Sequence, residues 1–352
     1  MDFDRYGKVK CSKIEGILPK LMTMVEGGDD RDSVATYDTI RLMTDFESKI
    51  YEAVSDNSFL FLKESLGRLL ERDAEFKQID NQLLTLTCAE LQIALELAVR
   101  AVVIRRFGIA GVLKDNQKKL GEEEIIEHYK RKTLKVEDFE KLKNYLKKNN
   151  ETSLLKQEFL EIERFQQYRN KIVHFACEFS EEELSSLRND ILYYVVHVIL
   201  VLLSEETTGE TPTEYLQRKL GDDFYKKLKK YRPYIRAMEH YADRMTSPVW
   251  TCIGCSQRTY SPEFDYCYIC GYETLTGYKR VDCASCGTKN SVIYDHLDIH
   301  NEGNHHTING MCLNCDEKTE VFECPECGVA HDVLLDYIGG DYCCEGNCVN
   351  KD

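Results

Sequence analysis

The fold of the first part of the chain is decided by Arg169-Asn170-Lys171-Ile172-Val173-His174, which places an arginine and a histidine five residues apart. Before it, apolar residues recur at steps of three and four, as on one face of a helix. The arginine continues that line, which contains Leu155, Phe159, Ile162, Gln166, Arg169 and Val173. We therefore expect a helix over residues 154–175. An arginine on or beside its buried face extends to solvent, pairs with a carboxylate or serves a site.

The spacing of Arg169 and His174 limits the geometry of such a site. Five residues correspond to about 140° around an ideal helix. One helix face cannot direct both side chains to a single point. The spacing therefore indicates either a helix that frays between the two residues or a site that two copies of the helix share.

Two more helices are expected to pack beside this one. The first covers residues 83–107, ends before Gly108, and has the apolar line Leu84, Cys88, Leu91, Leu95, Ala98 and Val102. The second begins at a capping box in which Ser180 is the N-cap and Glu183 lies three residues on. It extends to about residue 203, with Leu184, Leu187, Ile191, Val195, Ile199 and Leu202 in register.

The Arg-x4-His stretch, with Asn170 second and with these helices around it, resembles the motif of HEPN domains. The resemblance covers about residues 83–204 and implies a helical bundle that forms a homodimer with both motifs at the interface. It further implies metal-independent cleavage of RNA through the 2′-OH, with Arg169, His174 and Asn170 as catalytic residues. Many such enzymes are toxins or antiviral-defence effectors, so RNA is the expected partner.

Glu96 is a fourth candidate for the catalytic site. It stands four residues before Arg100 on the early apolar helix, and the resemblance implies that a glutamate there lies near the active site. The alternative is a simple ion pair between residues i and i+4, which contributes a few tenths of a kcal/mol.

The rest of the helical part divides by composition. Residues 1–80 are expected to form a helical N-terminal layer, with candidate helices at 12–25, 33–53 and 59–70. The HEPN-like domain covers residues 81–204 and contains a highly charged insertion, about 114–150, which is either a solvated helical hairpin or a surface that guides RNA.

A basic helical extension is expected over residues 205–248, where Pro233 should kink or split the helix. Its cations, Lys226, Lys227, Lys229, Lys230, Arg232 and Arg236, are interleaved with Tyr225, Tyr231, Tyr234 and Tyr241. Such tyrosines either stack on RNA bases or pack inward beneath a charged surface.

Thirteen of the sixteen cysteines lie between residues 252 and 348, mostly as Cys-x2-Cys pairs. This spacing resembles zinc ribbons and predicts a domain of three ribbons over residues 249–352, with about three structural zinc ions. The expected ligand sets are Cys252, Cys255, Cys267 and Cys270; Cys283, Cys286, Cys312 and Cys315; and Cys324, Cys327 and Cys348 with Cys344 or Cys343. Glycines follow the second cysteine of three pairs, where the turn needs a permissive backbone: Gly271, Gly287 and Gly328.

Four histidines in the second set, His296, His300, His305 and His306, are expected in a solvated loop, since that set already has four thiolates. The ribbons should present acidic charge. Of the net charge of −15, residues 251–352 carry −11, from six Lys or Arg and seventeen Asp or Glu. This charge favours a protein partner over nucleic acid for the ribbons.

The chain opens on an acidic sequence without an apolar run, so no signal peptide is expected. The longest apolar run, residues 191–203, is too short to span a bilayer, and a cytoplasmic protein without a membrane partner is expected. The predicted fold class is mainly α, a HEPN-like helical bundle followed by small β-rich zinc ribbons. Two other functions stay open: a non-catalytic HEPN dimerisation module and a zinc-ribbon adaptor that binds protein.

Overall fold

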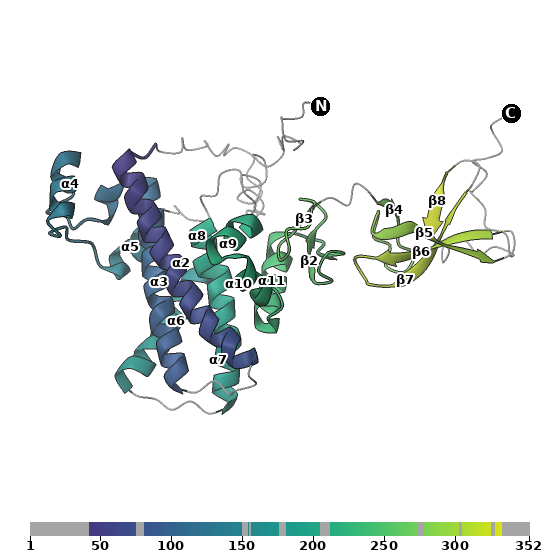
Figure 1. Ribbon diagram of the computed structural model, residues 1–352, viewed down its shortest axis with the longest axis horizontal. Coiled ribbons are helices and arrows are strands. Elements are labelled where there is room, and N and C mark those ends of the chain that lie inside the picture. The colour runs from purple at the N-terminus through teal and green to yellow at the C-terminus, as the bar shows by residue number, and fades with distance from the viewer. Residues whose placement is uncertain are drawn as a thin grey trace. The chain divides into compact units, whose positions relative to one another are not determined.

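The computed structural model describes residues 42–74, 81–149, 154, 156–175, 181–204, 212–273, 278–302, 305–324 and 328–332. The chain is mainly helical, with small antiparallel sheets in its C-terminal part, which confirms the predicted order of the two classes (Figure 1). It divides into unit 1, Met1–Ala237, and unit 2, Met238–Asp352. This division falls inside the helix Arg232–Met245, whereas the sequence places the domain boundary after residue 248. The predicted helix at residues 12–25 and the capping serine Ser180 lie outside the described residues.

Unit 1 begins with α2 (Asp45–Ala74), which packs along α3 (Asn81–Phe107). The predicted break between helices 33–53 and 59–70 is wrong, because α2 continues through residues 54–58. Ser55 and Ser58 in this polar segment are buried, and the hydroxyl of Ser58 donates to the carbonyl oxygen of Ala94 at 2.6 Å. Ser58 therefore faces α3, and its polarity marks a close contact between two helices and not a loop.

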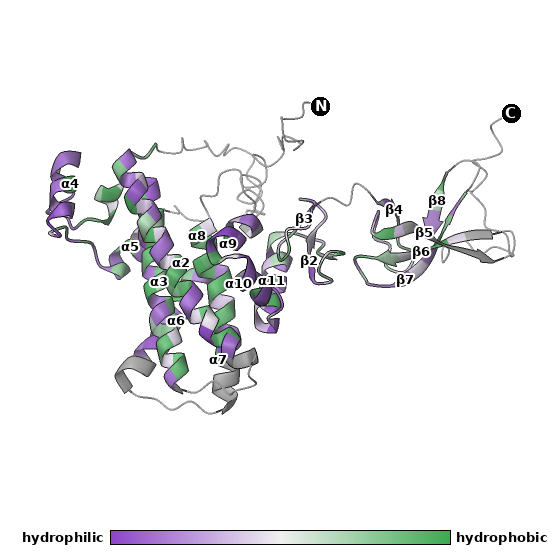
Figure 2. Ribbon diagram, in the orientation of Figure 1, coloured by the Kyte–Doolittle hydropathy of each residue, from purple (hydrophilic) through white to green (hydrophobic). Residues whose placement is uncertain are grey.

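Helix α3 runs through the middle of the helical core. The predicted apolar line is confirmed: Leu84, Cys88, Leu91, Leu95, Ala98 and Val102 are all at most 2% exposed. Figure 2 shows that α3 carries both hydrophobic and hydrophilic residues along its length. The helix ends where predicted, since Gly108 adopts a φ of 78°, a conformation that suits glycine.

The charged insertion contains a short 3-10 turn, η2 (Ile109–Val112), and two helices, α4 (Glu122–Lys130) and α5 (Phe139–Asn149). Most side chains of α4 are exposed. Helix α5 packs on α3 through buried Leu142 and Leu146 and through an edge-to-face contact between Phe107 and Tyr145, with ring centroids 4.8 Å apart. Part of the insertion is therefore core, which its charged composition conceals.

The predicted motif helix and closing helix are both present. Helix α6 (Lys156–Phe175) carries the Arg-x4-His stretch, and α7 (Glu181–Tyr194) continues through a π-helical turn, η3 (Val195–Ile199), into α8 (Leu200–Ser204). By length and composition alone, Leu187–Ser204 could cross a membrane, but 67% of it is buried inside the protein, as in a core helix. Phe165 of α6 stacks on Tyr194 at 4.1 Å between centroids, which joins the two helices.

The basic extension forms three short helices, α9 (Pro212–Leu220), α10 (Asp222–Leu228) and α11 (Arg232–Met245). The predicted split occurs just before Pro233, which occupies the second position of α11, where a missing N–H is tolerated. Tyr225, Tyr231 and Tyr234 are buried, so these three rings pack inward instead of forming a stacking surface.

Unit 2 contains two antiparallel sheets. The first has the order β1 (Trp250–Thr251), β2 (Arg258–Ser261), β3 (Tyr266–Cys267), and the second has β4 (Lys279–Val281), β5 (Val292–Glu302), β6 (His305–Cys312), β7 (Lys318–Glu323) and β8 (Ala330–Asp332). The predicted His-rich loop is wrong, because His296, His300, His305 and His306 lie on strands β5 and β6. β-branched residues elsewhere in these two strands favour the hairpin: Val292, Ile293, Ile299, Thr307 and Ile308.

Candidate functional site

A cleft in unit 1, with a volume of about 210 Å³, is lined by residues from three helical segments. Helix α3 contributes Gln92 and Glu96, and α6 contributes Gln166, Arg169 and Asn170; the start of α5 adds Asp138, Phe139 and Glu140. Three of the four predicted site residues, Glu96, Arg169 and Asn170, therefore line one cleft, although α3 and α6 are separated in sequence by the whole insertion.

Glu96 is held at this cleft by two neighbours on its own helix. Its Oε2 lies 3.5 Å from Nη2 of Arg100, and its Oε1 accepts a hydrogen bond from Nε2 of Gln92 at 3.2 Å. The ion pair considered from sequence is therefore present, and it lies at the wall of the cleft. The two side chains are 32% and 27% exposed, so solvent screens much of the attraction.

Arg169 is half-buried and Asn170 is exposed at the next position of α6. Nη1 of Arg169 donates to Oδ1 of Asn170 at 3.0 Å. Within the described residues, no carboxylate lies within ion-pair distance of Arg169. The guanidinium can therefore bind an anion without first breaking an ion pair in that part of the chain.

A network that the sequence analysis missed connects α5 to α6 beside Arg169. Nε2 of Gln166 donates to Oε1 of Glu140 at 2.6 Å, and Oε1 of Gln166 accepts from Nζ of Lys143 at 3.0 Å. Lys143 also pairs with Oε2 of Glu140 at 2.8 Å, and its side chain is only 5% exposed. Gln166 is a polar residue within the apolar line of α6. A polar residue at such a position indicates a hydrogen-bonding partner on a neighbouring element, and this was the sequence feature that could have predicted the network.

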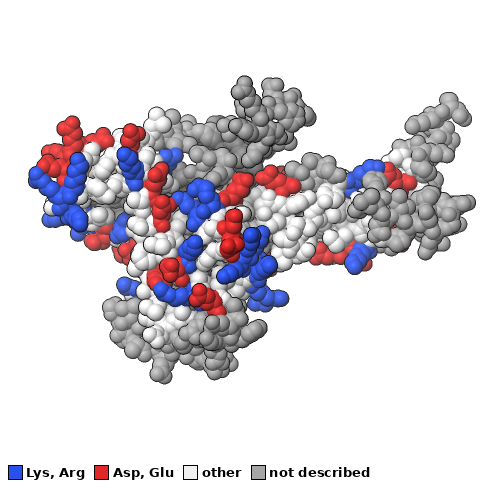
Figure 3. Space-filling view, in the orientation of Figure 1, with Lys and Arg blue, Asp and Glu red and all other residues white. Residues whose placement is uncertain are grey.

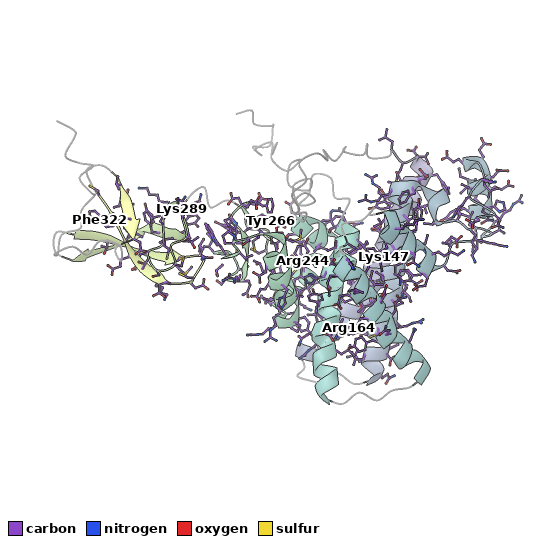
Figure 4. All side chains as sticks on the ribbon, turned by 180° about the vertical axis from the view of Figure 1, so that it is seen from behind. Lys147, Arg164, Arg244, Tyr266, Lys289 and Phe322 are labelled. Atoms are coloured by element: carbon purple, nitrogen blue, oxygen red, sulfur yellow. The ribbon has the colours of Figure 1, made fainter. Side chains whose placement is uncertain are left out.

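The same network sets the charge state of Glu140. Partial burial opposes ionisation of this carboxyl, but hydrogen bonds from Lys143 and Gln166 outweigh it and lower the pKa of Glu140. A second pair supports the α5–α6 contact: Nζ of Lys147, which is labelled in Figure 4, lies 3.4 Å from Oε1 of Glu163. The insertion therefore helps to form one wall of the cleft.

His174 lies on the same helix as Arg169, and its side chain is outside the described residues. Helix α6 is continuous from Lys156 to Phe175, so the helix does not fray between the two motif residues. Positions 169 and 174 are thus about 140° apart around the helix axis. Of the two geometries considered from sequence, the frayed helix is wrong.

The second candidate site is the pair of four-cysteine groups in unit 2. The Sγ atoms of Cys252, Cys255, Cys267 and Cys270 lie within 4.8 Å of one another, and so do those of Cys283, Cys286, Cys312 and Cys315. Cys252 and Cys270 have their Sγ atoms 3.5 Å apart, and Cys255 and Cys267 3.7 Å apart. In the second group, Sγ of Cys283 lies 3.8 Å from that of Cys315, and Sγ of Cys286 lies 3.8 Å from that of Cys312. Four sulfurs held at about 2.3 Å by one tetrahedral ion would be about 3.8 Å apart.

Each Cys-x2-Cys pair has the same backbone turn. The amide of the residue after the second cysteine donates to the carbonyl oxygen of the first, as for Gly271 to Cys267 and Gly287 to Cys283, both at 2.9 Å. That residue has a positive φ in every such turn described: Ser256, Gly271, Gly287, Asp316 and Gly328. The three predicted glycines are confirmed in this role, and a serine and an aspartate occupy it in the other two turns.

The predicted third set is only partly described. Cys324 is buried, and Gly328 donates to its carbonyl oxygen at 2.9 Å, as in the other turns. Cys327, Cys343, Cys344 and Cys348 lie outside the described residues. Two groups in the described part of unit 2 could thus hold a metal ion, with four sulfurs each and hydroxyls of Thr259 and Ser291 beside Cys267 and Cys312 at 3.3 and 3.2 Å.

Comparison with models of protein families, with curated proteins and with solved structures finds no match for this chain.

Proposed function

We propose that the protein is a metal-independent endoribonuclease of the HEPN type. The observation that carries this proposal is the shared cleft of Glu96, Arg169 and Asn170, in which two motif residues of α6 and the candidate glutamate of α3 lie together. The half-buried guanidinium of Arg169, without a carboxylate partner among the described residues, suits a phosphate group. The resemblance further suggests a toxin or an antiviral-defence effector as the biological role.

In the proposed reaction, the 2′-oxygen of RNA attacks the adjacent phosphorus. The new 2′-O–P bond forms as the P–O5′ bond breaks, and the products are a 2′,3′-cyclic phosphate and a 5′-hydroxyl. Arg169 binds the non-bridging oxygens and stabilises the charge that grows on them. His174 moves protons, from the 2′-hydroxyl and to the leaving 5′-oxygen, as suits a group that titrates near neutrality.

The decisive experiment incubates labelled RNA with the purified protein in EDTA. Wild-type protein is expected to yield fragments that end in a 2′,3′-cyclic phosphate, and His174→Ala protein is expected to yield none. His128→Ala is the matched control, because His128 is a half-buried histidine of α4 that does not line the cleft. Equal cleavage by both variants would rule out the proposed mechanism.

The continuity of α6 supports a site shared by two copies of the chain, since one helix cannot direct positions 169 and 174 to one point. We expect a homodimer by light scattering. We also expect that mixing inactive Arg169→Ala and His174→Ala chains restores activity to about one quarter of wild type, because half the dimers then hold one intact site. A fully active monomer, or a mixture without activity despite subunit exchange, would contradict the shared site.

Gln166 is expected to act as a positioning residue for Arg169. Gln166→Leu keeps the size of the side chain but removes both hydrogen bonds of the network on α5. We expect kcat to fall about tenfold with little change in KM, because binding persists while the arginine is misplaced. Gln167→Leu, at an exposed position of the same helix, is the control and should leave kcat unchanged. Identical kinetics of the two variants would remove this role.

For the ribbons, we propose that each four-cysteine group holds a structural zinc ion, about three ions in all with the third predicted set. Four thiolates fill the tetrahedron and leave no position for a substrate. Each site then adds about −2 to a region that already carries −11. This charge repels nucleic acid and suits a protein partner.

The charge of the cleft favours a second candidate, an adaptor without catalysis. Carboxylates of Glu96, Asp138 and Glu140 line the cleft beside the single guanidinium of Arg169, and they oppose the approach of a phosphate. Such an adaptor would bind protein through the acidic ribbons and leave RNA intact. The RNA incubation separates the two candidates directly.

A further inference from the structure

The segment that forms α10 and the start of α11 is strongly basic within an acidic protein. Residues 224–238 contain six cations and no acidic residue, whereas the whole chain carries a net charge of −15. Five of these six cations are exposed, and we call the four that have no carboxylate partner among the described residues the basic surface: Lys227, Lys230, Arg232 and Arg236. Lysine and arginine side chains gather over α10 and α11 in Figure 3.

Unlike many other cations on the protein, these four have no neutralising carboxylate among the described residues. Lys118, Arg131 and Lys279 are each at least 42% exposed, and each pairs with a carboxylate. Lys226 also pairs, with Asp223 at 3.6 Å. In the part of the chain that the structure describes, no carboxylate lies within 4.0 Å of the basic surface. Its positive charge is therefore available to an external anion.

The tyrosines of this segment give the basic surface a rigid base. Tyr225, Tyr231 and Tyr234 are 1%, 6% and 0% exposed, so their rings anchor α10 and α11 to the core of unit 1. Rings in this position cannot stack on nucleotide bases. The surface therefore offers cations alone, which contact phosphates and do not distinguish one base from another.

We propose that the basic surface binds the phosphate backbone of single-stranded RNA and holds the substrate outside the catalytic cleft. The choice of RNA among polyanions rests on the proposed ribonuclease function. Because the cations contact phosphates, binding is independent of the RNA sequence. Binding releases counterions from the RNA, and this release contributes less free energy at high salt, so the affinity falls steeply as the salt concentration rises. The acidic ribbons supply no comparable charge.

The test uses the full chain with His174→Ala, so that RNA is bound and not cleaved, and fluorescein-labelled oligouridylate as the probe. Adding Lys227→Gln, Arg232→Gln and Arg236→Gln is expected to weaken binding at least about tenfold and to reduce the slope of log Kd against log salt by about 2. The matched control is Lys118→Gln, Arg131→Gln and Lys279→Gln, which removes the same charge from paired cations. The control should retain the affinity of the parent protein.

Circular dichroism should be the same for both triple variants, because all six side chains are exposed. Equal affinity of the parent and the first variant would overturn the proposal, and so would an equal loss in the control. A variant that loses binding to vesicles rich in anionic lipid, but keeps its RNA affinity, would also overturn it. The wild-type chain could cleave no RNA while only the triple variant of the basic surface loses RNA binding. In that case the ribonuclease assignment is wrong, but the assignment of the basic surface as an RNA-binding surface is supported.

Discussion

Arg169→Ala is expected to lower the rate of RNA cleavage by about 100- to 1000-fold, the usual effect of removing one group that stabilises charge in the transition state. Arg169 projects into the cleft from α6 beside Asn170, and no described carboxylate competes for its guanidinium. The loss should appear in kcat, because the charge on the phosphate grows as the 2′-oxygen attacks. Single-turnover cleavage of labelled RNA measures it without interference from product release.

Arg164→Ala is the matched control on the same helix. Arg164, which is labelled in Figure 4, is 54% exposed, and its Nη2 lies 3.7 Å from Oδ2 of Asp190. It is not among the residues that line the cleft. This variant should cleave RNA at the wild-type rate. Arg169→Lys should retain part of the activity, because a lysine keeps the charge but cannot bind two phosphate oxygens in the planar geometry of a guanidinium. Wild-type activity in Arg169→Ala protein would refute the catalytic assignment.

The features that could be predicted from sequence are those that depend on local spacing. The apolar line of α3, its end at Gly108 and the helix that carries Arg169 and His174 follow from steps of three and four residues. The two cysteine groups follow from Cys-x2-Cys spacing, because each tight turn supplies two ligands from four residues. In these cases, the residues that make up the sequence pattern are close in sequence and belong to the same helix or the same turn.

The missed features depend on contacts between distant segments. The sequence 55–58 is polar, yet it continues α2, and the buried hydroxyl of Ser58 donates to the carbonyl oxygen of Ala94 on α3. The insertion is charged, yet Lys143 is buried, because Glu140 and Gln166 neutralise and hydrogen-bond its ammonium group. Polar residues in these places satisfy one another across helices. Composition alone assigns the same residues to solvent.

Removal of the metal is expected to unfold the ribbons and to leave the helical unit intact. In the second sheet, Cys283 and Cys312 belong to the buried cluster that also contains Val292 and Val321, so the ligands are part of a very small core. A structural zinc site contributes about 10–16 kcal/mol to the folding of such domains. Chelation should therefore abolish the sheet signal of unit 2, while the helical circular dichroism of unit 1 persists.

The second cysteine group should lose its metal first. Its Cys286 and Cys315 are exposed, whereas the first group alternates buried and half-buried cysteines. Release followed with a colorimetric zinc indicator should thus show two phases. Simultaneous release from both groups would contradict this order.

Cysteine substitutions provide the control for metal content. Cys267→Ser removes a ligand and should lower the zinc content by one ion per chain. Cys88→Ser should leave it unchanged, because Cys88 is buried among the helices and burial raises the pKa of its thiol to about 12, which disfavours the thiolate that binds metal.

RNA cleavage should persist in EDTA, because the proposed groups, Arg169 and His174, lie on α6 of unit 1 and need no Lewis acid. DNA should stay intact under the same conditions, since it has no 2′-hydroxyl to attack the phosphorus. Cleavage that disappears in EDTA and returns with Mg²⁺ or Mn²⁺ would identify a metal-dependent nuclease. That result would exclude the mechanism based on these two side chains, even if the Arg169→Ala and His174→Ala variants are both inactive.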